Sequence, residues 1–157
     1  MISECPECVI DDFRIDLYPN AYRLRKYLGS DKIVNIPSNI NGEKIKVIGG
    51  YSFCMNHFIK EVIIPRGVTD INIHAFAACP NLKTIVMPDT ITSIHKTAFY
   101  RCNSLNKVIF KGTPEQWDRI NRESICLCKA EVIYEKSSEL SNFLNTVSNT
   151  LAREQNK

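Results

Sequence analysis

VIIPRGVTDINIHAFAACPNLKT, residues 62–84, is followed directly by IVMPDTITSIHKTAFYRCNSLNK, residues 85–107. The two stretches have equal length and agree at seven of 23 positions. Unrelated segments of ordinary composition would share roughly one or two. The identical pairs are Pro65/Pro88, Thr69/Thr92, Ile71/Ile94, Ala75/Ala98, Phe76/Phe99, Cys79/Cys102 and Leu82/Leu105. A fixed period of this size is typical of stacked units, each too small to bury its own apolar face.

The same period extends beyond these two copies. An earlier copy begins near Ile33 and carries five extra residues, because Pro37 and Pro65 are 28 apart. The extra residues fall at 41–44, a turn-forming stretch that predicts a longer loop. A fourth copy begins at Val108 and then changes character.

Each unit contains an alternating segment that predicts a short strand. Ile85 and Met87 would point to one side and Thr84 and Val86 to the other, and Pro88 would end the strand because it cannot donate to a ladder. Stacking the units aligns these strands into a parallel sheet on one face of a solenoid. The phenylalanines at the common period would then stack inside it: Phe53, Phe76 and Phe99.

These residues resemble the BspA-like, or Treponema pallidum, class of leucine-rich repeats, whose unit reads roughly I-P-x-x-V-x-x-I-x-x-x-A-F-x-x-C-x-x-L. The first copy departs from that pattern, with Ser52 in place of Ala and Asn56 in place of Cys. The resemblance covers about residues 12–134. It implies a scaffold of bacterial type that binds proteins or ligands, frequently at a cell surface, and it implies no catalysis.

The expected fold is α/β: a leucine-rich repeat solenoid with a short parallel sheet on one face and a cap at each end. The predicted parts are an N-terminal cap (1–32) with a hairpin of Phe13–Leu17 and Ala21–Tyr27, the repeats (33–112), a helical C-terminal cap (113–134) and an amphipathic helix (135–157). Thr113 followed by Pro114 and Gln116 has the pattern of a capped helix start. Trp117 on that helix would shield the last coil, and Glu131–Tyr134 would add one more strand.

Apolar residues near the C-terminus recur at helical spacing. They fall at i, i+3, i+4, i+7 and i+11, which predicts a helix over roughly 138–153. The residues are Leu140, Phe143, Leu144, Val147 and Leu151. So short a helix is marginal alone in water. It could pack on its own solenoid, pair with a second copy or serve as a docking peptide, and the sequence leaves these three open.

The register also predicts which residues face outward from the sheet. Two columns emerge, and both are candidates for contact with a protein partner. The column next to the proline contains Asn35, Ile63, Val86 and Ile109, and the column two residues earlier contains Ile33, Glu61, Thr84 and Lys107. A row of aliphatic residues on an exposed strip is typical of an interaction site, although valine and isoleucine also suit strands for their own sake. The row could bind a partner or be covered by another part of the chain, and the sequence leaves both open.

Four cysteines outside the repeats form the only candidate metal site. Cys5 and Cys8 make a C-x-x-C pair, and Cys126 and Cys128 make a C-x-C pair. Four thiolates can close a tetrahedral zinc site. The pairs would lie at opposite ends of the solenoid, so a shared site needs the N-terminal segment to run back along the body or two chains to meet head to tail. Cys79 and Cys102 are expected to be buried core thiols.

No pattern in the sequence points to catalysis. There is no G-x-S-x-G, H-E-x-x-H, glycine-rich phosphate loop or Cys–His signature. The three histidines, His57, His74 and His95, do not share a repeat position. The net charge of +3 is small, so no nucleic-acid partner is expected. No stretch is long enough to span a membrane, and no secretion signal is recognisable, so a cytoplasmic location is expected, against a cell-surface one from the resemblance.

The sequence therefore predicts a non-catalytic protein-binding module that uses the outward side of its sheet. Two alternatives stay open: a homo-oligomeric assembly joined by zinc or by the C-terminal helix, and a small intracellular regulator or inhibitor. The sequence does not identify the partner.

Removal of residues 138–157 tests the amphipathic helix. If its apolar stripe covers a surface, the truncated chain should bind more 1-anilinonaphthalene-8-sulfonate or change its mass in size-exclusion chromatography with light scattering. Unchanged dye binding together with an unchanged mass would show that the segment covers nothing.

Overall fold

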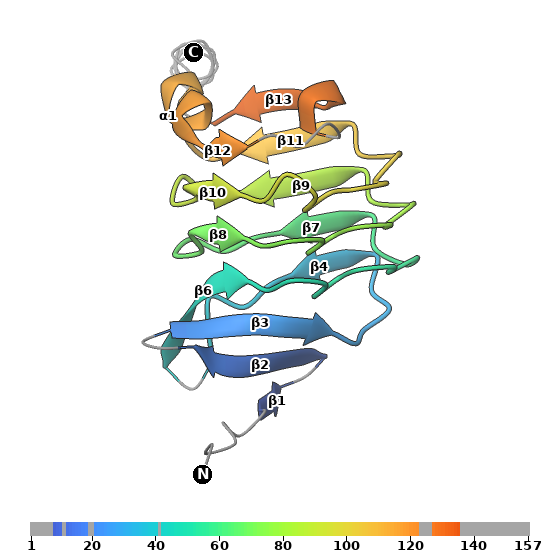
Figure 1. Ribbon diagram of the computed structural model, residues 1–157, viewed down its shortest axis with the longest axis vertical. Coiled ribbons are helices and arrows are strands. Elements are labelled where there is room, and N and C mark those ends of the chain that lie inside the picture. The colour runs from blue at the N-terminus through green and yellow to red at the C-terminus, as the bar shows by residue number, and fades with distance from the viewer. Residues whose placement is uncertain (1–7, 11, 19–20, 41, 123–126, 136–157) are drawn as a thin grey trace, which may run out of the picture.

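The computed structural model describes residues 8–10, 12–18, 21–40, 42–122 and 127–135. Its backbone winds in stacked coils, with one line of strands on each of two sides (Figure 1). The first line is a five-stranded parallel sheet in the order β13-β11-β9-β7-β4. Its strands are β4 (Ile33–Asn35), β7 (Glu61–Ile63), β9 (Thr84–Met87), β11 (Lys107–Phe110) and β13 (Glu131–Tyr134).

The pairing register follows the sequence period. Ile63 pairs with Val86, and Val86 pairs with Ile109, so equivalent residues of successive coils lie side by side. The predicted stacking of the segments that begin at Val62 and Ile85 is therefore confirmed. The strand predicted at Glu131–Tyr134 is present and extends the sheet by one member.

The expectation of one sheet was wrong in one respect, because the structure has a second sheet. Its eight strands run in the order β1-β2-β3-β6-β8-β10-β12, with β5 beside β6. They are β1 (Cys8–Ile10), β2 (Phe13–Tyr18), β3 (Ala21–Tyr27), β5 (Asn39–Ile40), β6 (Glu43–Ile48), β8 (Asp70–Ile71), β10 (Ser93–Ile94) and β12 (Asn121–Arg122). Segments of two residues are too short to show an alternating pattern, but stacked coils align their amides and carbonyls.

The N-terminal hairpin is present as predicted and joins the repeats through backbone pairing. β2 and β3 are antiparallel, with a bulge between Arg14 and Ile15, and β3 then runs parallel to β6. The first coil passes so close to β3 that a Cβ at Gly49 would lie 2.5 Å from the carbonyl oxygen of Leu24. The extra residues of the first copy form a small hairpin, β5–β6, with Gly42 at a φ of 85°.

The core is a continuous stack of aromatic rings at the coil spacing. The ring centroids of Phe53 and Phe76 are 4.8 Å apart, and those of Phe76 and Phe99 are 5.1 Å apart with an interplanar angle of 1°. Tyr27 continues the stack below Phe53 at 5.3 Å, and Phe13 follows at 5.1 Å. The phenylalanine stack predicted from the sequence is confirmed, and the hairpin extends it.

A second ladder runs through the cysteine position of the repeat. The Cys79 thiol donates to the carbonyl of Phe53 at 3.1 Å, and the Cys102 thiol donates to the carbonyl of Phe76 at 2.8 Å. Asn56 takes this position in the first copy. Its side-chain amide donates to the carbonyl of Gly29 at 3.3 Å. The replacement of cysteine by asparagine therefore keeps a bond to the preceding coil.

Helix is scarce in the described part of the chain. α1 (Pro114–Arg119) begins with a capping box, in which Thr113 and Gln116 bond to each other's backbone amides. Its Trp117 is buried, with its ring 5.1 Å from that of Phe110. A 3-10 turn, η1 (Leu127–Lys129), precedes β13. The helix predicted over 138–153 lies outside the described residues, and the role of residues 113–134 as an end cap stays a prediction.

The aromatic stack makes a quantitative prediction. Phe76→Ala removes the central ring and should lower the free energy of unfolding by about 3–5 kcal/mol, measured by urea denaturation followed by circular dichroism. Phe58 is a matched control because its side chain is 58% exposed. Phe58→Ala should change stability by less than about 0.5 kcal/mol. Equal losses in the two variants would contradict the stacked core.

Candidate binding surface

The outward side of the five-stranded sheet, which we call the sheet face, is built from residues that alternate with the core. Val34, Val62, Ile85 and Val108 point inward and are at most 3% exposed. On each strand, the residues on either side of the inward one point outward, as the sequence predicts. The structure brings all seven predicted contact residues to this one side: Asn35, Glu61, Ile63, Thr84, Val86, Lys107 and Ile109.

The aliphatic row on the sheet face differs from the prediction in two ways. Val86 points outward but is only 8% exposed, whereas Ile63 and Ile109 on either side of it are half-buried. The expectation of three exposed aliphatic residues was therefore wrong for Val86. In addition, Ile133 on β13 pairs with Ile109 and adds a fourth member that sequence reasoning missed. Aligning the predicted strand Glu131–Tyr134 with the one before it could have found Ile133.

The second column on the sheet face is mainly polar. Glu61, Thr84, Lys107 and Glu131 are successive partners across β7, β9, β11 and β13. Ile33, paired with Glu61, is 57% exposed at the end of the column. The acidic and basic members alternate, so this column carries little net charge.

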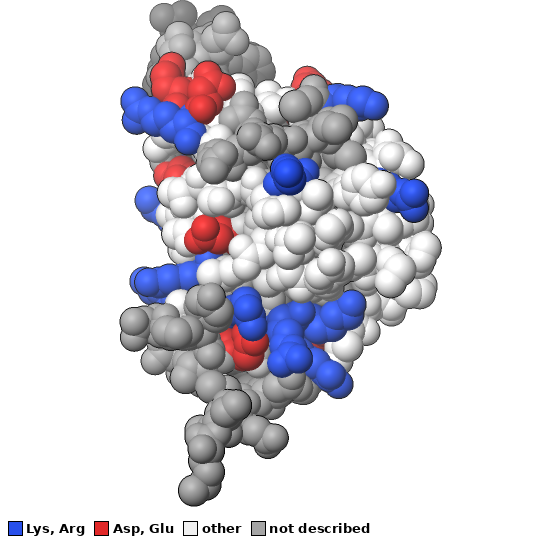
Figure 2. Space-filling view, in the orientation of Figure 1, with Lys and Arg blue, Asp and Glu red and all other residues white. Residues whose placement is uncertain are grey.

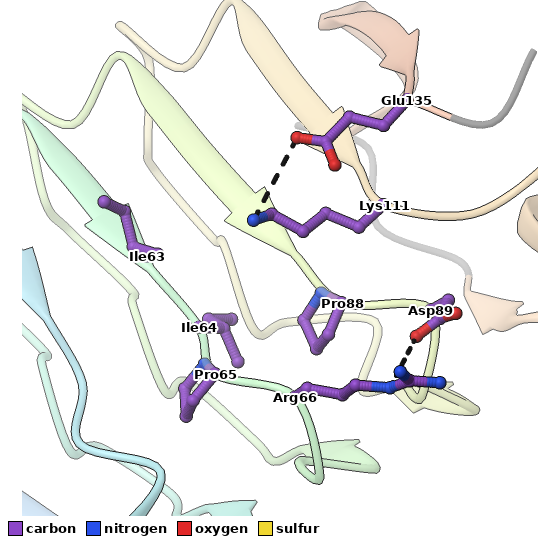
Figure 3. Close-up of a pocket in the computed structure, with 8 residues that line it drawn as sticks. All are labelled: Ile63, Ile64, Pro65, Arg66, Pro88, Asp89, Lys111 and Glu135. Atoms are coloured by element: carbon purple, nitrogen blue, oxygen red, sulfur yellow. Dashed lines mark ion pairs between the residues drawn. The ribbon is translucent and has the colours of Figure 1, made fainter. Parts of the chain in front are cut away.

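A groove lies where the strands of this sheet end. It has a volume of about 350 Å³ and is lined by Ile63, Ile64, Pro65, Arg66, Pro88, Asp89, Lys111 and Glu135. Figure 3 shows Pro65 and Pro88 on neighbouring coils, with charged side chains around them. Pro65 and Pro88 have no amide hydrogen to continue the strand ladder, so β7 and β9 end close to them. Both prolines also line the groove.

Two ion pairs flank the groove. Arg66 Nε lies 3.4 Å from Asp89 Oδ1, and Lys111 Nζ lies 4.0 Å from Glu135 Oε1 (Figure 3). Lys111 and Glu135 are each 46% exposed, so water screens their attraction and either side chain can turn to a partner at little cost. An apolar lining with exchangeable charges at its edge is suited to non-covalent binding.

Only two of the four cysteines predicted as a zinc site belong to the described residues. Cys5 and Cys126 lie outside the described residues. Cys8 begins β1 and Cys128 lies in η1, which Figure 1 places at opposite ends of the stack. In the described ranges, no group of three or more His, Cys, Asp or Glu side chains is arranged to hold a metal ion.

Cys79 and Cys102 are buried free thiols, as predicted. Cys79 is fully buried and Cys102 is 2% exposed, whereas Cys54 is half-buried. The side-chain hydrogen bond with Cys102 and burial both raise the pKa of the Cys79 thiol. The thiolate is the reactive form of cysteine, so Cys79 is held in its unreactive state.

The histidines occupy three different settings. His57 is exposed, and His95 Nδ1 lies 3.0 Å from the hydroxyl of Thr97. His74 lies between two tyrosines, in the turn that follows β8 of the eight-stranded sheet. None of the described helices has the length and apolar character of a membrane span.

The stacked coils, with a parallel sheet open on one side, define a solenoid of the leucine-rich repeat class. The family described as BspA type leucine rich repeat region matches residues 29–147, in six copies. This match spans most of the chain, and the chain belongs to that family. No curated protein matches it.

Solved structures agree on the fold. A leucine-rich repeat protein of T. pallidum is 23% identical, with a TM-score of 0.63, and the alignment covers 82% of this chain and 64% of that one. One from Bacteroides capillosus is 19% identical, also with a TM-score of 0.63, and covers 82% of this chain and 98% of that one. One from Bacteroides ovatus is 22% identical, with a TM-score of 0.54, and covers 81% of this chain and 37% of that one. These relatives are repeat proteins, a kind of protein that is not built for catalysis.

The buried thiols give a prediction that separates the cysteines. In the native protein at pH 8, iodoacetamide should modify Cys54 and leave Cys79 and Cys102 intact, because both of these thiols are buried and inaccessible to the reagent. Mass spectrometry of tryptic peptides reads each site. Unfolding in urea should make all three react alike. Modification of Cys79 at the rate of Cys54 without denaturant would disprove the assignment.

Proposed function

We propose that the chain is a non-catalytic module that binds a protein partner through the sheet face. The observation that carries the proposal is the aliphatic row of Ile63, Val86, Ile109 and Ile133, four strands in continuous register. A contiguous apolar strip bordered by polar residues is typical of interaction sites. Family membership supports the same conclusion, since the repeat scaffold is consistent with protein interaction.

The groove supplies the second element of this proposal. It adjoins the aliphatic row at Ile63 and offers an arginine, a lysine and two carboxylates at its edge. A partner that lays apolar side chains along the row would bring its polar groups to these four charges. The row would then provide most of the binding free energy, and the charges would fix the orientation.

The rival hypotheses depend on residues that the structure does not describe. Zinc-linked assembly requires Cys5 and Cys126, and helix-mediated pairing requires 138–153. Both stay predictions, as do the cytoplasmic location expected from the sequence and the intracellular regulator hypothesis. No described contact favours any of them over partner binding at the sheet face.

The test of the sheet face uses Ile63→Asp combined with Ile109→Asp. Both side chains are half-buried, so each aspartate keeps access to water. Val86→Asp is unsuitable, because at 8% exposure an aspartate would be buried and would destabilise the fold. Proteins retained from an extract of the source cells by the immobilised wild-type chain would be identified by mass spectrometry and purified. Their direct affinity should fall at least about tenfold with the double variant.

Leu28→Asp is the matched control for this experiment. Leu28 is 50% exposed, directly follows β3 and belongs to no strand of the five-stranded sheet. It introduces the same kind of change without touching the row, so binding should be retained. The proposal would be contradicted if the double variant folds normally by circular dichroism and binds the same proteins with unchanged affinity.

A further inference from the structure

The coils carry a second surface, on the side where the chain leaves β6, β8 and β10. We call it the turn face and define it by residues 49–57, 72–80 and 95–103. Backbone hydrogen bonds tie each turn to the next: Phe53 N donates to Ala75 O at 2.7 Å, and Phe76 N donates to Ala98 O at 2.8 Å. The turn face is therefore a fixed platform rather than a set of independent loops.

Left-handed backbone conformations recur on the turn face and shape it. Five non-glycine residues of the described chain have a positive φ, and all five belong to these turns: Tyr51, Met55, His74, Ala78 and Arg101. Their φ values lie between 53° and 60°. Such a conformation is uncommon for residues other than glycine, and here the inter-coil hydrogen bonds hold it. Large side chains are thereby presented on a rigid backbone.

Apolar exposure is concentrated on this surface. Of seven large hydrophobic side chains that are exposed in the described chain, four lie on the turn face: Tyr51 (53%), Met55 (67%), Ile73 (42%) and Tyr100 (51%). The Tyr51 ring stacks on the His74 ring at 5.1 Å, and the Tyr100 ring meets His74 edge-on at 6.2 Å. These three rings form an aromatic strip across successive coils.

The His74 ring in this strip has an unusual feature. Its Nδ1 atom is buried and has no hydrogen-bond partner among the described residues. Buried polar atoms are nearly always paired in native proteins, which makes this nitrogen an exception in the described chain. The strip is thus the one place in the described chain where a buried side-chain nitrogen or oxygen is left unsatisfied.

The charge on the turn face has one sign. The chain contains 17 acidic residues, yet none occurs in 49–57, 72–80 or 95–103. Lys96 and Arg101 do occur there and are exposed. The Arg101 guanidinium lies over the Tyr100 ring at 5.4 Å, and Lys26 Nζ reaches the Tyr51 carbonyl at 3.4 Å from the neighbouring hairpin. Figure 2 shows this side with a broad uncharged area, blue groups within it, and both blue and red groups along its border.

These features favour one kind of ligand. Exposed aromatic and aliphatic side chains fit apolar groups, and Lys96 and Arg101, which lie in turns without acidic residues, fit carboxylates. Nucleic acid is less suited, because its binders neutralise many phosphates along a broad basic stripe, whereas the cations named above are few. Three coils span two strand spacings, about 10 Å, which an extended peptide crosses in about three or four residues.

We propose that the turn face is a second binding site, distinct from the sheet face, for a short acidic peptide segment with apolar side chains. Its carboxylates pair with Lys96, Arg101 and Lys26. Its apolar side chains pack against Tyr51, Ile73 and Tyr100. The occupant is a linear segment of another protein, so the solenoid can hold two partners on opposite sides.

The test uses a fluorescein-labelled peptide of sequence Glu-Phe-Glu-Leu-Glu-Phe-Glu and the full chain, with binding read by fluorescence anisotropy. The wild type should bind this peptide and should not bind a matched peptide with lysine at each glutamate position. Lys96→Glu with Arg101→Glu should weaken binding about tenfold or more, as expected for two reversed charge pairs. Tyr51→Asn with Tyr100→Ser should also weaken it, since asparagine tolerates the left-handed conformation at position 51.

Two control variants show whether peptide binding is confined to the turn face. Lys44→Glu with Lys129→Glu makes the same charge change at exposed positions off the turn face, and it should alter the affinity less than about twofold. Ile63→Asp with Ile109→Asp should leave peptide binding intact. The peptide experiment can therefore fail without contradicting partner binding at the sheet face, and the reverse also holds.

Three outcomes would overturn the proposal. The first is absence of binding by the wild-type chain. The second is binding that the Lys44/Lys129 variant reduces as much as the Lys96/Arg101 variant does, or that the sheet-face variant abolishes. The third is tighter binding of a labelled twelve-nucleotide thymidine strand than of the peptide, which would make nucleic acid the ligand.

Discussion

Every coil of this protein rises by one strand spacing, and this single constraint organises the molecule. Backbone pairing in two sheets sets a repeat of about 4.8 Å. A side chain that points inward therefore meets its counterpart from the next coil. Phe76 and Phe99, parallel to within 1° and 5.1 Å apart, show the result most directly. Parallel rings at this centroid distance are offset, which is an arrangement that aromatic pairs favour, so the coil spacing and the preference of the rings agree.

A stack of equal coils has two open ends, each of which exposes apolar surface. At the N-terminal end, Tyr27 and Phe13 continue the phenylalanine stack into the β2–β3 hairpin. After the last full coil, Phe110 packs against Trp117 of α1 and against Tyr134 of β13. Residues outside the repeat thus use the same aromatic contacts as the repeat itself, and the core is continuous from Phe13 to Trp117.

The same constraint produces long surfaces of uniform chemistry. The sheet face repeats an aliphatic position and gains a row from Ile63 to Ile133. The turn face repeats a left-handed position and gains an aromatic strip with basic neighbours. One side is aliphatic with balanced charge, and the other is aromatic with one sign of charge. Differences in ligand preference between the two sides follow from these side chains, because the backbone beneath both is nearly invariant.

The sequence by itself determined the register and the buried phenylalanines and cysteines of the repeats, because a 23-residue period assigns equivalent residues the same environment. The hairpin and the strand at 131–134 lie outside that period and were predicted from their local sequence. Only the tertiary structure decided the rest. Two-residue strands such as β8 depend on coil-to-coil hydrogen bonds, which local sequence does not encode. Val86 is buried whereas Ile109, which also has a paired strand on each side, is half-buried, and the common register does not encode that difference. Tyr100 meets His74 although the two occupy different repeat positions, since side chains pack by distance in space and not by sequence register.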